Sequence, residues 1–266
     1  MMSLHLPMSP EPARRSQIAV MAALSLALLL LTAAWALVDG RLINEAPVWA
    51  KPFKFALSFA VLFGTLALIA ERLSPGWRNS WTLRMTTAVM TAAMIMEMGY
   101  MIVMAARQQA SHFNVSTPFT SLMYSLMGVG AVALMVGVAV FGVVALRDAK
   151  AAFGPALRWG VGWGCILSFA LTLVTAGTMG AAGTHVGVAA AGAATLPLMG
   201  WSATVGDLRP AHFLALHAMQ VLPLVGLLFD RTGIPARWML FVGLAYAALT
   251  ALVFAQALAG LPLVAL

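Results

Sequence analysis

Two ionisable side chains, Glu97 and His217, lie well inside apolar stretches of the sequence. An ionisable group near the centre of a membrane-spanning helix costs about 3 kcal/mol or more, so each one is a candidate for function. Glu97 precedes the end of its stretch, Ala106, by nine residues, and His217 follows the start of its stretch, Pro210, by seven. At 1.5 Å per helical residue, these are depths of about 13 Å and about 10 Å from the same side. The agreement predicts one shared polar site.

Helical geometry extends both positions along their helices. Steps of 100° bring Gln108 back towards the direction of Glu97, which predicts a face running from a buried carboxyl to an outer amide. His217 and Gln220 are three residues apart and share a face, whereas His212 points about 140° away from His217. These directions predict one site, with His212 on its outer rim and with His217 and Gln220 in its inner part.

Each of these residues can also be explained without a ligand. Glu97 also fits a protonated carboxyl bonded within its own helix, and His217 with Gln220 fits hydrogen bonding between helices. Asp207 and Arg209, just before the apolar stretch at Pro210, equally fit a helix cap and an interfacial anchor.

Three functional hypotheses are compatible with these residue types. His112, His212 and His217 are candidate metal ligands, because neutral imidazole binds metals and serves as a haem axial ligand. A haem or a transition metal near the outer face would indicate a redox or quinone-linked protein. Alternatively, Glu97 and His217 form a proton-titratable pocket for a small solute. The third hypothesis is a non-catalytic assembly or sensory protein.

No known catalytic signature is present. The chain lacks His-Glu-x-x-His, the P-loop and the Gly-x-Ser-x-Gly nucleophile turn. No catalytic residue follows from the sequence, and enzymatic activity is left open.

The composition determines the class of protein that must position these residues. The chain is 62% hydrophobic and 9% charged, with a mean hydropathy of +0.94, whereas soluble domains are about 25% charged. Long apolar blocks predict an all-α membrane protein, a bundle of about seven transmembrane helices whose main partner is the lipid bilayer. The expected spans are 18–38, 52–70, 81–106, 119–146, 157–179, 210–229 and 235–257.

Charge and cysteine content exclude other classes. The net charge of +7 is not gathered into a basic block or an arginine-rich arm, so we expect no nucleic-acid partner. The single cysteine, Cys165, excludes a disulfide framework.

The distribution of lysine and arginine predicts the orientation. With the N-terminus inside, ten of the 15 basic residues fall in inner segments and the other five in outer ones, which favours N-in and C-out. We therefore expect a cytoplasmic tail over 1–17, one transmembrane domain over 18–258 and a short outer tail over 259–266. The first apolar run, 21 residues at 18–38, exceeds the 7–15 of a signal peptide and is expected to stay as a span.

Two further stretches carry expectations. The outer connection over 180–209 is long enough to suggest a lid or a re-entrant segment, and a flexible linker fits it equally. Gly160 and Gly164 form a Gly-x-x-x-Gly pattern, which predicts close helix packing.

Several motifs resemble an uncharacterised family of bacterial multi-pass inner-membrane proteins, over about residues 47–225. They are Lys51-Pro52-Phe53-Lys54-Phe55, Ser111-His112-Phe113-Asn114, and Gly206-Asp207-Leu208-Arg209 followed by His212-Phe213, His217 and Gln220. The resemblance implies a bacterial inner-membrane location but no reaction.

The candidate ligand- or cofactor-binding set combines the motif residues with the intramembrane ones. A small-molecule ligand and a membrane-protein partner or second copy are its expected partners. The set is Lys51, Lys54, Glu97, Gln108, His112, Asn114, Asp207, Arg209, His212, His217 and Gln220.

Overall fold

Among the residues that the structure describes, seven helices are long and apolar enough to cross a membrane. The structure, a computed structural model, describes residues 17–43, 46–190, 192–197 and 199–265. Each expected span corresponds to one helix, which confirms the all-α membrane class. The helices are α1 Gln17–Trp35, α2 Ala50–Arg72, α4 Trp81–Ala106, α5 Pro118–Arg147, α6 Pro155–Ala182, α7 Arg209–Thr232 and α8 Met239–Leu258.

Short elements connect the long helices. The helical turn α3 (Pro75–Arg78) and the 3₁₀ turn η1 (Ala236–Trp238) precede α4 and α8. Strand β1 (Leu42–Ile43) pairs antiparallel with β2 (Ala46–Pro47), and β3 (His185–Val186) pairs antiparallel with β4 (Gly206–Asp207).

Local sequence signals set several helix ends. The Ser80 hydroxyl accepts a hydrogen bond from the Leu83 amide at the start of α4, and Thr117 forms a capping box with Thr120 at the start of α5. Pro155 stands in the first turn of α6, where the missing amide hydrogen costs no helical bond. Gly233, with φ of +74°, ends α7 in the left-handed conformation that glycine adopts without strain.

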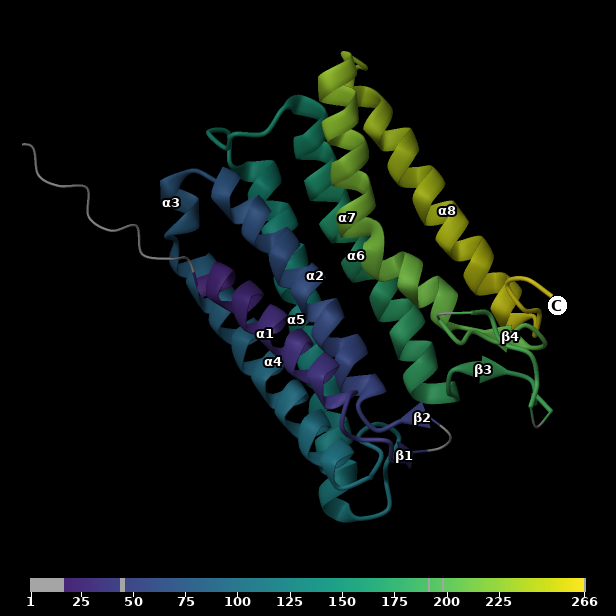
Figure 1. Cartoon of the computed structure of the whole chain (residues 1–266). Helices are drawn as coiled ribbons and strands as arrows, with labels where there is room; N and C mark the ends of the chain where they lie inside the picture. The colour runs from purple at the N-terminus through teal and green to yellow at the C-terminus, as the bar shows by residue number, and fades with distance from the viewer. Residues whose placement is uncertain (1–16, 44–45, 191, 198, 266) are drawn as a thin grey trace, which may run out of the picture.

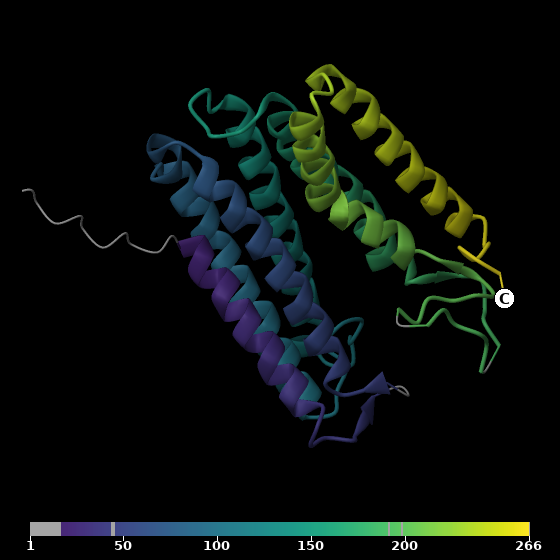
Figure 2. The ribbon, with the colours of Figure 1, turned by 45° about the horizontal axis from the view of Figure 1, so that its top comes forward.

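The helices form two groups that lie side by side (Figures 1 and 2). One group contains α1, α2, α4 and α5, and the other contains α6, α7 and α8; α5 packs against α6. Their shared apolar core includes the fully buried Phe63, Met94 and Phe141. Exposed leucines such as Leu30, Leu126 and Leu228 face outwards, as expected for surfaces in contact with lipid.

Glycines bring α6 and α7 into the most extensive helix contact of the chain. A Cβ added at Gly160 would lie 2.5 Å from the Leu222 carbonyl oxygen, and one at Gly164 would lie 2.8 Å from that of Ala218. On the other side, a Cβ at Gly226 would lie 2.5 Å from the Ala156 carbonyl oxygen. The close packing predicted from the Gly-x-x-x-Gly pattern is therefore confirmed.

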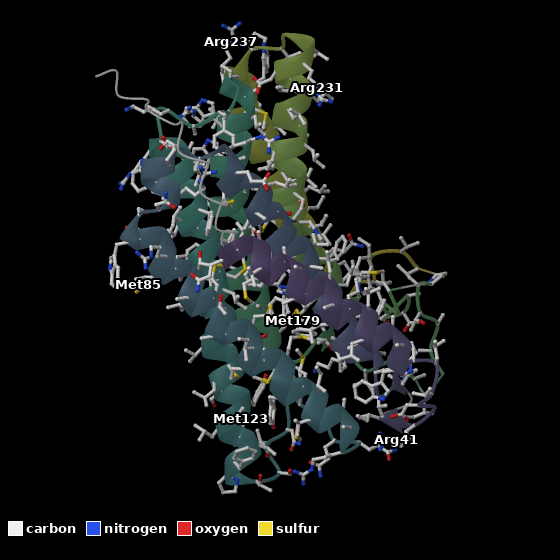
Figure 3. The ribbon with its side chains drawn as sticks, turned by 60° about the vertical axis from the view of Figure 1, so that its left-hand side comes forward. Arg41, Met85, Met123, Met179, Arg231 and Arg237 are labelled. Atoms are coloured by element: carbon white, nitrogen blue, oxygen red, sulfur yellow. The ribbon has the colours of Figure 1, made fainter. Side chains whose placement is uncertain are left out.

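The two ends of the bundle differ in structure and charge. We call the end formed by 36–49, 107–117 and 183–208 the hairpin end, because it carries both strand pairs. We call the end formed by 73–80, 148–154 and 233–238 the basic end, where Arg231 and Arg237 lie opposite Arg41 of the hairpin end (Figure 3). The assignment of the basic end to the cytoplasm stays a prediction.

The long connection after α6 is neither structureless nor helical in its described residues. The β3–β4 pair closes its base, and an isolated bridge joins Thr195 to Ser202. Much of its middle is exposed, including Val188. The sequence is compatible with a lid, a re-entrant segment or a flexible linker for this connection. Its described residues contain no helix, and backbone pairing joins the two arms of the loop.

Candidate functional site between helices α2 and α7

A chain of polar side chains joins α7 to α2 within the membrane-spanning region. Nδ1 of His217 lies 3.2 Å from Oε1 of Gln220, and Nε2 of Gln220 donates to Oγ1 of Thr65 at 3.1 Å. The Phe213 ring packs on the His217 ring with a centroid separation of 4.2 Å. The face predicted to hold His217 and Gln220 is therefore confirmed, and the pair bonds to a residue of another helix.

The direction of these hydrogen bonds follows from the threonine. The Thr65 hydroxyl donates to the Val61 carbonyl at 2.7 Å, so it accepts from the Gln220 amide. This orients the Gln220 oxygen towards His217, whose Nδ1 then carries the hydrogen. In neutral His217, Nε2 is consequently the hydrogen-bond acceptor.

A groove of about 280 Å³ opens beside this polar chain. Apart from Thr65, Gln220 and Arg72, its lining is apolar and comes from α2, from the loop before α6, and from α6 and α7. These apolar residues are Leu68, Ile69, Phe153, Leu157, Val161, Met219, Pro223, Leu224 and Leu227. Since Thr65 and Arg72 are seven residues apart on α2, the polar ends of the groove are separated by about 10 Å.

Arg72 stands where the groove meets the basic end. One nitrogen of its guanidinium donates to the Leu68 carbonyl at 3.0 Å, and the side chain is exposed. Of the nearby acids, Asp148 accepts from the Ser74 amide, and Asp230 accepts from the Ala156 and Leu157 amides at the start of α6. Glu71, the residue before Arg72, is exposed and forms no ion pair among the described residues. Every ion pair found among the described residues lies at the hairpin end. The basic end therefore presents arginines without carboxylate partners.

Glu97 lies apart from this groove. It is buried in α4 at the contact with Gly130 of α5, whereas α7 packs on α6 and α8. In Figures 1 and 2, α4 and α7 lie on different sides of the molecule, with other helices between them. The agreement in depth predicted from the sequence does not bring Glu97 and His217 together, because equal depth leaves the position around the bundle undetermined.

The three histidines considered as metal ligands have separate surroundings. His212 contacts Thr175 of α6 through Nδ1 at 3.1 Å, and His112 contacts Phe55 and Tyr124. His217 bonds to Gln220, as described above. In the part of the chain that the structure describes, no three His, Cys, Asp or Glu side chains come together as a metal-binding group. The geometry therefore does not support a shared metal site of these histidines.

The environment of His112 keeps its ring neutral. Burial, together with the positive charge of Lys51, lowers the pKa of His112 to about 3. The Ser111 hydroxyl lies 3.1 Å from its Nδ1. Of the two lysines in the candidate set, Lys51 lies close enough to His112 to affect its charge. Lys54 is exposed.

Gln108 and Asn114 shape the loop of the hairpin end. Gln108 adopts φ of +55° just after α4, and its amide donates to the Leu42 carbonyl at 2.8 Å. The Asn114 oxygen accepts from the amide and hydroxyl of Ser116, and its amide donates to Ala110. The predicted helical face from Glu97 to Gln108 is wrong at its outer end, because α4 stops before Gln108.

Asp207 organises the long loop of the hairpin end. Its buried carboxylate accepts hydrogen bonds from the Ser202 amide at 2.8 Å and from the Arg209 side chain at 2.9 Å. Burial alone would raise the pKa of Asp207, but the hydrogen bonds from Arg209 and Ser202 outweigh it and hold the pKa below the usual value. His185 of β3 lies 3.5 Å from the same carboxylate. Asp207 and Arg209 therefore hold the loop together.

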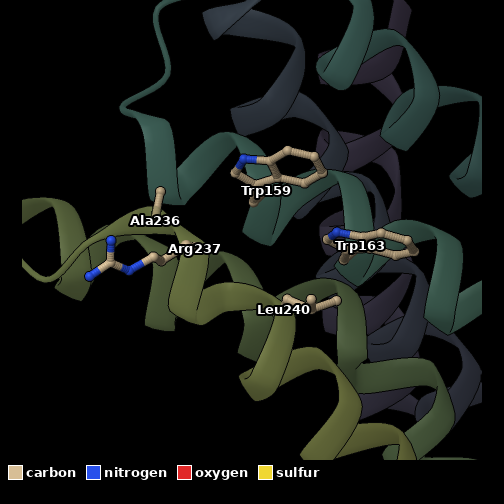
Figure 4. A pocket seen from close by; sticks show the side chains of 5 residues that line it. All are labelled: Trp159, Trp163, Ala236, Arg237 and Leu240. Atoms are coloured by element: carbon tan, nitrogen blue, oxygen red, sulfur yellow. The ribbon is translucent and has the colours of Figure 1, made fainter.

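A second hollow, of about 470 Å³, lies at the basic end between α6 and α8 (Figure 4). Trp159 and Trp163 stack with a centroid separation of 6.4 Å, and Leu240 points towards them, while the Arg237 side chain points away. Tryptophan at this level is typical of the membrane–water interface. The hollow gathers no acid or histidine, so we regard its tryptophans as interfacial anchors.

Three residues of these sites are absent from the set selected from the sequence. Thr65 and Arg72 are seven residues apart, which places them on one helix face, and this spacing was a usable signal. His185 lies in a loop, and its approach to Asp207 depends on the β3–β4 pairing, for which no sequence signal stands out.

Comparisons of the chain with protein-family models, with curated proteins and with solved structures found no match.

Proposed function

We propose that this multi-pass membrane protein binds an anionic membrane lipid in the groove between α2 and α7. The observation that carries the proposal is the layout of the groove: an arginine at its interfacial end, an apolar lining, and a polar closure deeper in the membrane. An amphiphile with a negative head group and an apolar chain matches this order, because its charged part would meet the arginine and its chain would meet the apolar lining.

The charge of the basic end supports an anionic head group. Arg72 has guanidinium donors beyond the one used by Leu68, and a guanidinium matches the geometry of a phosphate. Asp148 and Asp230 bond to backbone amides, and no arginine of the basic end forms an ion pair among the described residues, so arginine donors there are free to bind an anion.

The Gln220–Thr65 bond explains why a groove persists between these helices. Helices α2 and α7 are not among the extensively packed pairs, so their separation leaves space for a chain. The hydrogen bond joins them at the inner end of that space. Its proposed role is to position the two walls of the groove.

The test is lipid retention by the purified protein, measured by native mass spectrometry in mixed micelles of phosphatidylglycerol or phosphatidylcholine with matched chains. We expect the wild type to retain phosphatidylglycerol preferentially. Arg72→Gln should weaken this retention about tenfold, since a charge-assisted hydrogen bond contributes about 1.5 kcal/mol or more.

The matched control is Arg84→Gln, which removes an exposed arginine near the start of α4 that does not line the groove. We expect less than a twofold change for this variant. Equal retention of the two lipids by the wild type would contradict the proposal, and so would equal losses in the two variants.

A further inference from the structure

Two buried polar atoms on one face of α4 have no hydrogen-bond partner among the described residues. They are Oε1 of Glu97 and the hydroxyl of Tyr100, one helical turn further on. Only 3% of Glu97 is exposed. Buried polar atoms are nearly always paired, so an unpaired carboxyl oxygen indicates a ligand or a functional state.

The contact with α5 is shaped around this carboxyl. A Cβ added at Gly130 would lie 2.9 Å from Oε1 of Glu97 and 3.2 Å from Cε of Met96. Any side chain at position 130 would therefore have to displace the carboxyl or move the helix. By contrast, Gly128 on the same helix faces open space.

The surroundings of Glu97 favour its neutral form. Met94 and Met101, one turn before and after it on α4, are buried, as is Met127, one turn before Gly130 on α5. No lysine, arginine or histidine of the described residues forms an ion pair with Glu97. An isolated carboxylate in such surroundings is very costly, and protonation removes that cost.

Few other charged or titratable groups belong to the elements around Glu97. On α4 the nearest is Tyr100. Arg84 precedes Glu97 by thirteen residues and Arg107 follows it by ten, about 20 Å and about 15 Å along the helix direction. Helix α5 has none before Arg147 except Tyr124, α1 has none, and α2 has Lys51, Lys54, Glu71 and Arg72 only near its ends. Protonation of Glu97 therefore depends mainly on its hydration.

We propose that Glu97 is a proton-binding site at the α4–α5 contact, independent of the lipid groove. The carboxyl holds its proton while the two helices are closed on Gly130. When the helices separate, water enters and accepts the proton, leaving a carboxylate and a hydronium ion.

Infrared spectroscopy of the purified protein tests the proposal directly. We expect a protonated-carboxyl C=O band at pH 7 that disappears reversibly as the pH is raised, is missing in Glu97→Gln, and is unchanged in Glu71→Gln, where an exposed acid is removed. Absence of the band at low and neutral pH would overturn the proposal. A band that persists up to pH 10 would also overturn it, because the carboxyl would then be only a packing element.

A glycine pair provides a second measurement that needs no change of the acid itself. Gly130→Ala should separate α4 from α5 and lower the midpoint of the titration by about one pH unit, a tenfold loss of proton affinity, whereas Gly128→Ala should leave it unchanged. Equal midpoints in the two variants would contradict the role of the contact.

Chemical labelling of the wild type covers the case in which the variants fail to fold. Dicyclohexylcarbodiimide reacts with protonated carboxyl groups in apolar surroundings, so we expect modification at Glu97, slowing as the pH rises, and little at Glu71. Labelling of Glu71 but not of Glu97 would count against a protonated Glu97.

Discussion

Gln220 of α7 and Thr65 of α2 are joined by a hydrogen bond of 3.1 Å across a region where their helices are not closely packed. The bond connects two walls of the groove through two polar side chains that line it. Gln220 also contacts His217, so a histidine, an amide and a hydroxyl form one hydrogen-bonded unit.

We expect this unit to stabilise the arrangement of α2 and α7. Thr65→Val and Gln220→Leu should each lower the free energy of unfolding by about 0.6–1.7 kcal/mol, the range found for hydrogen bonds between membrane helices. Because the two residues contact each other, the double variant should lose less than the sum of the single ones. Unfolding in mixed detergent measures the three values, and strict additivity would show that the bond contributes nothing.

Close packing of α6 on α7 predicts a sharp difference between two glycines. Gly226→Ala places a methyl group 2.5 Å from the backbone oxygen of Ala156, which cannot move without shifting α6. We expect a loss of about 1–3 kcal/mol of stability. Gly177→Ala on α6 meets nothing within 4 Å and should be neutral or slightly stabilising. Thermal unfolding of the two variants in detergent makes the comparison.

The low pKa of His112 predicts that the folded protein loses stability in acid. Its pKa is about 3 in the folded protein and about 6.5 in an unfolded chain, so between these values the unfolded state binds more protons. Stability should therefore fall as the pH falls below about 6.5, by about 2 kcal/mol at pH 5. Unfolding measured at pH 7.5 and pH 5 should show this difference in the wild type.

The control for this effect removes the titrating group. His112→Phe should be less sensitive to acid than the wild type by most of that amount. If His112→Phe kept the full pH dependence, another group would be responsible.

Asp207→Asn should loosen the long loop of the hairpin end. The change removes the charge that Arg209 binds and leaves donors of Ser202 and Arg209 poorly satisfied, at a cost on the order of 2 kcal/mol. Hydrogen exchange over 183–208 should accelerate. His185→Gln removes only an outer contact of the same carboxylate and should have a small effect; equal acceleration in both variants would contradict the central role of Asp207.

The sequence was sufficient to predict the helices, but not which helices pack against one another. The length and hydropathy of each apolar stretch predict seven spans, because a helix that crosses the bilayer must satisfy its own backbone hydrogen bonds. The same local reasoning places His217 and Gln220 on one face, and Gly160 with Gly164 at a close contact. Each of these properties depends on a few consecutive turns of one helix.

Which helices lie beside one another was decided only by the tertiary structure. Glu97 and His217 have similar depths, yet one contacts Gly130 of α5 and the other is linked to Thr65 of α2. Depth follows from the 1.5 Å rise per residue, whereas the angular position around a bundle depends on packing between helices far apart in the sequence. For that reason the sequence alone identified the polar residues and their levels, and the fold separated them into a groove between α2 and α7 and a buried carboxyl between α4 and α5.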